Sequence, residues 1–348
     1  MLLNHHLRTR HRLCRFIALA GILLGGLSAA PAHAATLDDV LDRGRVRCGV
    51  APDLPGFAEA NSLGAYSGFD IDFCRAVAAA VLGDDRAIET MPIEADGQFN
   101  ALAAGEFDVL SRNTTWTLER NALNGEFVGT IFRDGQGFMV PGRSDIRTAL
   151  QLDGITVCVP RDEVVEAATK VYFDRVDIAY RPAVYSNQQA AFAAYVKGEC
   201  DSVTGDRTVL AAIRSRLDQP ASHVFLPESI TKQPRSPMVR ADDPQWENIV
   251  RWSLHCLINA EELGVTSDNA AARARDPNGD VRLLLGVDGA TGFALGIRRD
   301  WCASIVSRVG NYGELYERHL GMQSPMGLER GINALWIDGG LLYAPPIR

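Results

Sequence analysis

The sequence lacks the residue patterns on which most metal and nucleophile sites depend. It has no C-x-x-C pair and no His/Cys cluster at metal-ligand spacing, so a zinc site has little support. No Ser-His-Asp or Cys-His nucleophile pattern is visible, and four of the seven histidines fall within the first 33 residues. We therefore expect no metal, no cofactor and no catalytic residue.

Positive charge is also scarce. The chain has 35 Lys and Arg against 43 Asp and Glu, which gives a formal net charge of −8. The first 34 residues hold four of the arginines and no acid, so the rest of the chain has a net charge of −12. An acidic chain is a poor partner for nucleic acid or an anionic membrane, and we exclude both.

Long apolar runs are missing apart from one near the N-terminus, Phe16–Leu27. Four arginines precede this run and the small-x-small motif Ala32-His33-Ala34 follows it, which is the pattern of a signal peptide. The run is too short to span a bilayer comfortably. We predict a signal peptide over residues 1–34, a mature chain that starts near Ala35, and export to the periplasm.

The remaining chain is long enough for two domains, and 47% of all residues are hydrophobic, as in globular proteins with full cores. An even number of cysteines follows the signal peptide, which favours disulfides in an oxidising compartment. The sequence alone does not choose among their pairings, and buried free thiols are the alternative. These cysteines are Cys48, Cys74, Cys158, Cys200, Cys256 and Cys302.

The stretch Ser111–Arg120, SRNTTWTLER, concentrates polar side chains after a predicted strand end, GEFDVL. It places four hydroxyl residues, an Asn and two Arg within ten positions. Hydroxyls, backbone N–H groups and a guanidinium are the donors that a buried carboxylate requires. By spacing alone, however, the run is better explained as a helix start, with Thr117 as N-cap and Glu119 in the first turn.

Alternating strand and helix patterns continue on both sides of this stretch. We predict a helix over Thr36–Arg43, a strand over Val46–Val50, and a helix that ends at Gly83. After a Gly-rich segment, Asp134–Asp145, a second αβ pattern begins. Its predicted strands are 155–159, 177–181 and 201–204, and its predicted helices are 163–173 and 187–197. A Pro-rich segment, 234–244, ends this pattern, and a long helix is predicted after it, over 246–263.

The segment GFDIDFCRAVAAAV resembles the signature of the family 3 bacterial extracellular solute-binding proteins. Further segments resemble one branch of that family, the general L-amino-acid-binding periplasmic proteins of ABC importers. They are LPGF, DVLSRNTTWTL, DGQGFMV, FAAYVKGECD, NIVRWSLHCLINAEELG, GNYGELYER and NALWIDGGLLYAPPIR.

The resemblance implies an α/β fold of two lobes, the type II periplasmic binding protein fold with two hinge crossovers. We place the first crossover near Met139–Pro141 and the second within Pro234–Pro244. Lobe I then comprises residues 35–140 and 239–348, with a C-terminal extension packed over it, and lobe II is the insert 141–238. On this division we predict the disulfides Cys48–Cys74 and Cys158–Cys200, each joining a strand to a neighbouring element of one lobe. Cys256 and Cys302 stay unassigned.

The resemblance also implies a site for a zwitterion between the lobes. Arg120 matches the arginine that binds the ligand α-carboxylate, with Thr115 and Asn113 as its partners. Asp206 matches the lobe II carboxylate that receives the α-ammonium. Four residues near this pocket are candidates for side-chain selection, although Phe57 is equally compatible with the core: Asp53, Phe57, Arg112 and Trp116.

One run departs from the family pattern. Relatives usually have Gln-x-Gly-Thr-Thr-Thr-Glu after the strand TVCV, whereas this chain has PRDEVVE over Pro160–Glu166. Asp162 and Glu163 therefore lie at a helix start that binds an anion in relatives. Either these carboxylates cap the helix and face away, or they face the cleft and require a cation. A second departure is Arg133, where relatives tend to have an aromatic residue.

Three functions follow from these observations. The first is a monomeric periplasmic receptor that binds a small-molecule ligand, an amino acid, and delivers it to the transmembrane subunits of an ABC permease. The second keeps the fold but binds an amine or a modified amino acid. The third is a dehydratase-like enzyme acting on prephenate-type substrates, for which new carboxylates in the cleft would supply a general acid.

Overall fold

The computed structural model describes residues 36–348, and the predicted signal peptide lies outside this range. The fold is α/β and has two five-stranded sheets, which confirms the predicted two-lobed class. None of the helices in residues 36–348 combines the length and apolar character needed to cross a bilayer.

The first sheet has the strand order β4-β1-β5-β14-β6. β1 (Val46–Val50) is parallel to β4 (Ile88–Pro92) and β5 (Val109–Leu110). β14 (Met238–Val239) comes from the far side of the second lobe and pairs antiparallel with both β5 and β6 (Glu126–Phe127). Lobe I is therefore built from two separate parts of the chain.

The second sheet has the order β10-β9-β11-β8-β12. β9 (Thr156–Pro160) is parallel to β10 (Arg181–Tyr185) and β11 (Ser202–Asp206), while β8 (Gln136–Pro141) is antiparallel to β11 and β12 (His223–Ser229). The first crossover is thus not near Met139–Pro141, because these residues already belong to the second sheet. The strand predicted at 177–181 is also wrong, since Asp177 ends the preceding helix in a left-handed conformation (φ 54°) and β10 begins at Arg181.

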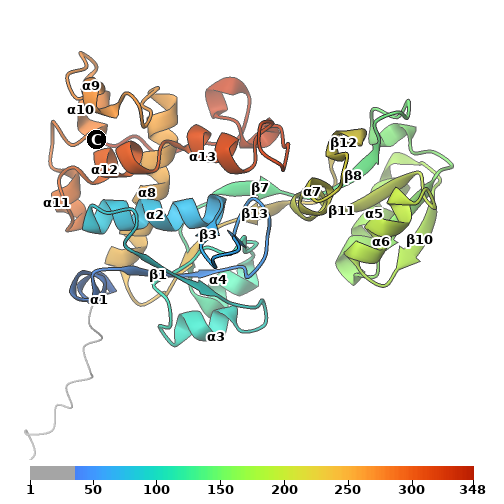
Figure 1. The fold of residues 1–348 in the computed structure, drawn as a ribbon, viewed down its shortest axis with the longest axis horizontal. Coiled ribbons are helices and arrows are strands. Elements are labelled where there is room, and N and C mark those ends of the chain that lie inside the picture. Colours follow the sequence, from blue (N-terminus) through green and yellow to red (C-terminus); the bar gives the residue numbers. More distant parts are fainter. Residues whose placement is uncertain (1–35) are drawn as a thin grey trace, which may run out of the picture. The chain divides into compact units, whose positions relative to one another are not determined.

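A pair of antiparallel strands joins the two sheets. β7 (Phe132–Asp134) precedes β8, and β13 (Gln233–Arg235) follows β12, and they lie side by side (Figure 1). In their register Asp134 is opposite Gln233 and Phe132 is opposite Arg235. The only other sheet within residues 36–348 is the hairpin of β2 (Glu59–Ala60) and β3 (Tyr66–Ser67) in lobe I.

Helices surround both sheets. In lobe I, α2, α8, α12 and α13 pack together over a core that includes Trp246, Trp301 and Tyr312 (Figure 1). α2 ends at Gly83, whose positive φ of 71° suits its role as C-cap. The helices are α1 (Thr36–Arg43), α2 (Phe69–Leu82), α3 (Gln98–Ala103), α4 (Leu118–Asn124), α5 (Glu163–Val176), α6 (Gln188–Val196), α7 (Arg207–Ser215), α8 (Pro244–Glu262), α9 (Ala270–Arg273), α10 (Gly279–Leu284), α11 (Thr291–Leu295), α12 (Trp301–Arg308) and α13 (Tyr312–His319).

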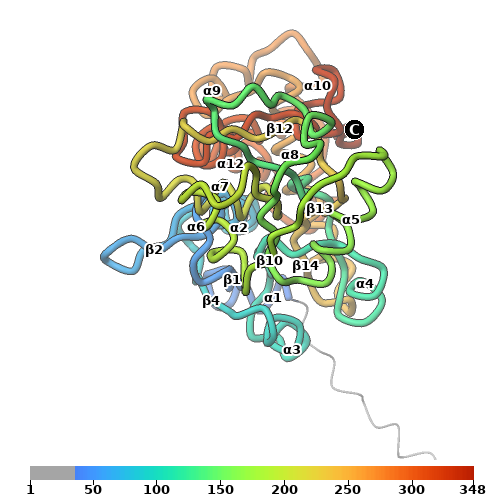
Figure 2. Tube along the Cα trace, turned by 90° about the vertical axis from the view of Figure 1, so that its right-hand side faces the viewer, coloured from blue at the N-terminus to red at the C-terminus, as the bar shows by residue number. Residues whose placement is uncertain are grey.

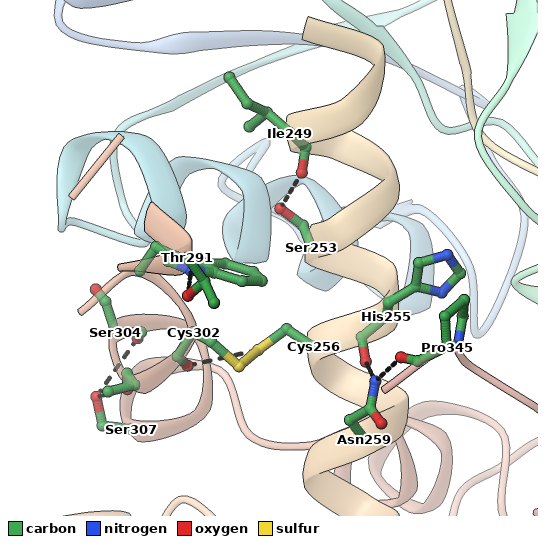
Figure 3. The surroundings of a disulfide bond; sticks show 12 residues. Ile249, Ser253, His255, Cys256, Asn259, Thr291, Cys302, Ser304, Ser307 and Pro345 are labelled. Carbon is green, nitrogen blue, oxygen red and sulfur yellow. Dashed lines mark hydrogen bonds between the residues drawn. A yellow bond between two sulfur atoms is a disulfide. The ribbon is translucent and has the colours of Figure 1, made fainter. Parts of the chain in front are cut away.

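All six cysteines of the described chain are paired. Cys48–Cys74 joins β1 to α2, and Cys158–Cys200 joins β9 to the turn before β11, as predicted. The cysteines left unassigned form a third bridge between α8 and α12, with 5.7 Å between the Cα atoms of Cys256 and Cys302 (Figure 3). Each bridge stays within one lobe.

The C-terminal segment packs against lobe I as expected. Asn259 on α8 donates a hydrogen bond of 2.9 Å to the carbonyl of Pro345 (Figure 3), and Leu342 and Ile347 are buried in the lobe I core. The chain ends beside α10 (Figure 2), and the Nε atom of Arg348 lies 3.8 Å from a carboxylate oxygen of Asp280.

Candidate functional site

The two crossover strands carry a buried ion pair. The Nη2 atom of Arg235 on β13 donates to the Oδ2 atom of Asp134 on β7 at 2.9 Å. The Asp134 side chain is 1% exposed and also accepts a hydrogen bond of 2.5 Å from the Thr208 hydroxyl at the start of α7. A charge removed from water in this way needs a close partner, so the pair holds the guanidinium of Arg235 between the lobes.

Arg235 also links the two predicted halves of the zwitterion site. Its Nη1 atom donates to the Thr115 hydroxyl at 2.6 Å and to the Asn113 carbonyl at 3.3 Å, both in the segment after β5. Its Nη2 atom donates to the Oδ2 atom of Asp206, at the end of β11, at 3.0 Å. The structure therefore brings Asn113, Thr115 and Asp206 to one guanidinium.

Asp206 lies in a partly buried, acidic neighbourhood. Its Oδ1 atom accepts a hydrogen bond of 2.6 Å from the Gln233 amide, and its side chain is 25% exposed. Burial raises the pKa of Asp206, and the nearby charge of Asp134 adds to that rise, while Arg235 opposes it. A cation near Asp206 would therefore be stabilised by two carboxylates.

The two arginines predicted for the site, Arg120 and Arg112, come from lobe I, whereas Asp206 comes from the second sheet. Arg120, in the first turns of α4, donates to the Thr115 carbonyl at 2.9 Å, and its guanidinium lies 5.8 Å from the centre of the Phe99 ring. Burial lowers the pKa of Arg120, and the charge of Arg235 lowers it further. Arg112 donates from Nε to the Ile93 carbonyl at 2.8 Å. Within residues 36–348, neither arginine has a carboxylate within 4.0 Å.

A second carboxyl group adjoins the cluster from α2. Asp70 is 2% exposed and accepts a hydrogen bond of 3.1 Å from the Ser111 hydroxyl. Burial raises the pKa of Asp70 to about 7, although Ser111 and the charges of Arg112 and Arg235 favour its ionised form. Near neutral pH it is therefore only partly ionised, and it supplies part of a negative charge beside these arginines.

Two of the residues predicted to select the ligand side chain lie elsewhere, whereas Trp116 adjoins the cluster through a hydrogen bond of 2.8 Å from its backbone N–H to the Pro234 carbonyl. Phe57 is 1% exposed and packs edge-on against Phe69 and Phe132, so it belongs to the lobe I core. Asp53 forms an exposed ion pair of 2.9 Å with Arg216, just after α7, rather than joining the cluster. Trp116 stacks on Phe127 at 5.4 Å between ring centres and is 38% exposed.

The departure from the family pattern is resolved as helix capping for Asp162. Its Oδ1 atom accepts hydrogen bonds of 2.9 Å and 3.1 Å from the backbone N–H groups of Val164 and Val165. Glu163 is exposed in the first turn of α5. An acidic side chain at this position stabilises the helix by itself. The replacement of Gly-Thr by Asp162-Glu163 is therefore explained without a cation or a general acid in the cleft.

Sequence reasoning missed Arg235, Asp134 and Gln233. All three lie in segments that the sequence identified only as crossovers. No partner was assigned to Arg235, which lies between Pro234 and Ser236. Its pairing with Asp134 depends on the register of two strands 101 residues apart, which no local pattern reports. Arg133, the second departure, is hydrogen-bonded through its backbone to Asn333 of the C-terminal segment.

Other parts of the described chain show no comparable site. Residues 36–348 contain no group of three or more His, Cys, Asp and Glu side chains placed to hold a metal ion. A cavity of about 750 Å³ in lobe II is lined by Arg143, Tyr195 and His223 among others, and none of the predicted ligand-binding residues lines it.

Comparisons with known proteins give the family and several similar proteins. Residues 46–269 match the model of the bacterial extracellular solute-binding proteins, family 3. The chain is 45% identical to the general L-amino acid-binding periplasmic protein AapJ of Rhizobium johnstonii, over 94% of this chain and 97% of that protein. It is 42% identical to the glutamate/glutamine/aspartate/asparagine-binding protein BztA of Rhodobacter capsulatus, over 94% and 97%.

A solved structure is similar over nearly the whole chain. It is a periplasmic binding protein of an ABC transporter from Brucella ovis with glutathione bound. The TM-score is 0.78 and the identity 43%, and the match covers 91% of this chain and all of that one.

Proposed function

Since the chain belongs to the bacterial extracellular solute-binding proteins of family 3, we propose that it binds an α-amino acid in the periplasm and delivers it to the transmembrane subunits of an ABC importer. Its similarity to AapJ and BztA over almost their full lengths supports this function. We further propose that it acts as a monomer and binds its ligand without turning it over.

The observation that carries the proposal is the distribution of charge between the two sheets. Arg120 lies on α4, between strands β5 and β6 of the first sheet, and has no ion-pair partner within residues 36–348, whereas Asp206 ends a strand of the second sheet. A zwitterion presents one charge to each. In the proposed complex Arg120, Thr115 and Asn113 bind the α-carboxylate, and Asp206 binds the α-ammonium.

Binding of this kind couples the ligand to the relation between the lobes. A ligand held by Arg120 alone or by Asp206 alone leaves the other charge unpaired, so the full gain requires both lobes. We propose that the lobes meet at the crossover strands, which places lobe II at about residues 135–232 rather than 141–238. On this division both crossover residues of the cluster, Asp134 and Arg235, lie at the hinge.

A ligand other than a free amino acid must keep the α-carboxylate and the α-ammonium. Glutathione, found in the Brucella ovis relative, ends in a γ-glutamyl group that carries an α-carboxylate and an α-ammonium. The geometry gives no comparable support to a simple amine, because Asp162 is occupied as a helix cap.

Isothermal titration calorimetry of the purified protein tests this proposal. The panel is the L-amino acids, their D-enantiomers, glutathione, and amines that lack an α-carboxylate. We expect saturable binding with one site for at least one α-amino acid or γ-glutamyl compound, and no heat with the corresponding amine. Tight binding of an amine combined with no response to any α-amino acid would refute the proposed function.

A further inference from the structure

The proposed site has an excess of positive charge. Three guanidinium groups, those of Arg112, Arg120 and Arg235, meet in and around it. In the described chain, the ion pairs of these arginines are limited to the two that Arg235 makes, with Asp134 and Asp206. The charges of Glu94, Asp70 and Asp96 also act on Arg112. Glu94 and Asp96 are exposed to solvent and therefore screened, and the buried Asp70 is only partly ionised.

A bound zwitterion does not remove this excess. Its α-carboxylate neutralises one charge, that of Arg120. Its α-ammonium takes a place at Asp206, which Arg235 now occupies with a hydrogen bond of 3.0 Å. Arg112 then still has no ion pair within residues 36–348, and Arg235 keeps only Asp134 of its two carboxylates.

Arg235 cannot leave when the ligand takes its place at Asp206 and Thr115. Its Nη2 atom remains bound to Asp134, which is 1% exposed and is itself fixed by Thr208. The Arg235 side chain is only 10% exposed, and its Nε atom is buried without a hydrogen-bond partner in residues 36–348. A cation that is anchored, desolvated and released from one carboxylate favours a new anionic partner.

We propose that Arg235 is a specificity-determining residue, and that it pairs with a second carboxylate of the ligand beyond the α-carboxylate. This inference rests on the proposed function. It predicts that ligands with two carboxylates bind best, that neutral amino acids bind less well, and that cationic amino acids bind worst because they add a like charge. The second carboxylate can come from an amino-acid side chain or from the C-terminus of a small peptide.

Two matched pairs of ligands test the proposal on the wild-type protein. Glutamate and glutamine have the same shape and differ in the side-chain charge. Glutathione and its C-terminal amide differ in the charge of the peptide end. We expect a lower Kd for the charged member of at least one pair. A preference in the first pair assigns the carboxylate to a side chain, and a preference in the second assigns it to a peptide terminus.

Substitutions then connect this preference to Arg235. Arg235→Gln should lower the preference by about 10-fold or more, which is the low end of the couplings measured for close charge pairs at interfaces, whereas Arg235→Lys should keep most of it. Arg216→Gln is the matched control, because it also removes an arginine that pairs with an acid of the other lobe, Asp53, but in an exposed position. Thermal unfolding establishes that each variant is folded.

The outcomes separate the two proposals. If the wild type binds both members of each pair equally, or if Arg235→Gln leaves the preference unchanged, Arg235 does not set specificity and this inference is refuted alone. If Arg235→Gln does not fold, the wild-type ratios and Arg235→Lys decide. If no α-amino acid and no γ-glutamyl compound binds the wild type, the proposed function itself is refuted.

Discussion

The protonation of Asp70 should make the stability of this protein depend on pH in a direction opposite to that of an ordinary aspartate. The carboxyl is buried and its pKa is raised to about 7 from an ordinary value of 3.8. In the unfolded chain it loses its proton near pH 3.8, but in the folded chain it keeps the proton up to about pH 7. Stability is therefore lost as the pH rises through this window.

Asp70→Asn measures the size of this effect. Asparagine keeps the oxygen that accepts the hydrogen bond of 3.1 Å from Ser111, and it carries no charge at any pH. At 1.36 kcal/mol per pKa unit, the difference between 3.8 and about 7 amounts to about 4 kcal/mol. The variant should therefore be about as stable as the wild type at pH 4 and up to about 4 kcal/mol more stable at pH 8.

Urea unfolding followed by circular dichroism at several pH values gives the free energies of unfolding. The matched control is Asp72→Asn, two positions along the same helix. Burial alone would raise the pKa of Asp72, but hydrogen bonding to His319 and the charges of Arg75 and Arg318 lower it overall. That variant should lose stability at pH 8, and less of it in acid. A gain for Asp70→Asn that is equal at pH 4 and pH 8 would refute the reasoning.

Three further predictions concern the site and the core. Arg120→Ala and Asp206→Ala should each weaken α-amino-acid binding by two to four orders of magnitude, because an unpaired buried charge costs about 3–5 kcal/mol; calorimetry checks this against Arg216→Ala, and near-normal affinity would mean that the charges are misassigned. Replacing residues 162–164 by Gly-Thr-Thr should cost roughly a few tenths of a kcal/mol of stability, because glycine is itself a tolerated N-cap, and leave the ligand profile unchanged; a gain of acidic ligands would show that the carboxylates face the cleft. The buried His255 has a pKa lowered to about 4, so stability should fall by about 3 kcal/mol as the pH drops from 6.5 to 4; His255→Gln should flatten that part of the Tm profile, and an unaltered profile would contradict the burial argument.

Features with a local signal in the sequence were predicted well. The change from alternating to helical spacing in GFDIDFC and the glycine after it define α2, which ends one residue before Gly83. Thr117 caps α4 through a hydrogen bond from the backbone of Arg120, as the spacing indicated. At Asp162 the local interpretation was also the better one, since the carboxylate caps α5. In each case the determining contacts lie within a few residues.

Features that depend on distant segments could not be predicted in this way. Whether Phe57 contacts a ligand or the core depends on Phe69 and Phe132, which approach it only in the folded lobe. The role of Arg235 depends on the β7–β13 register and on the end of β11. A charged residue in a predicted crossover is a useful warning, but its partner is decided by tertiary structure.

The place of β14 between β5 and β6 of the first sheet sets the order in which the two lobes can be completed. During synthesis, which proceeds from the N-terminus, β5 and β6 are made early. The strand between them, β14, is made only after the entire second sheet. Until Met238 arrives, the strand edges at Leu110 and Phe127 have no partner there. Unpaired edges with apolar side chains promote aggregation. A nascent chain that stops short of residue 238 therefore carries a sheet that is open between β5 and β6, and the lobe that begins first is the last to be finished.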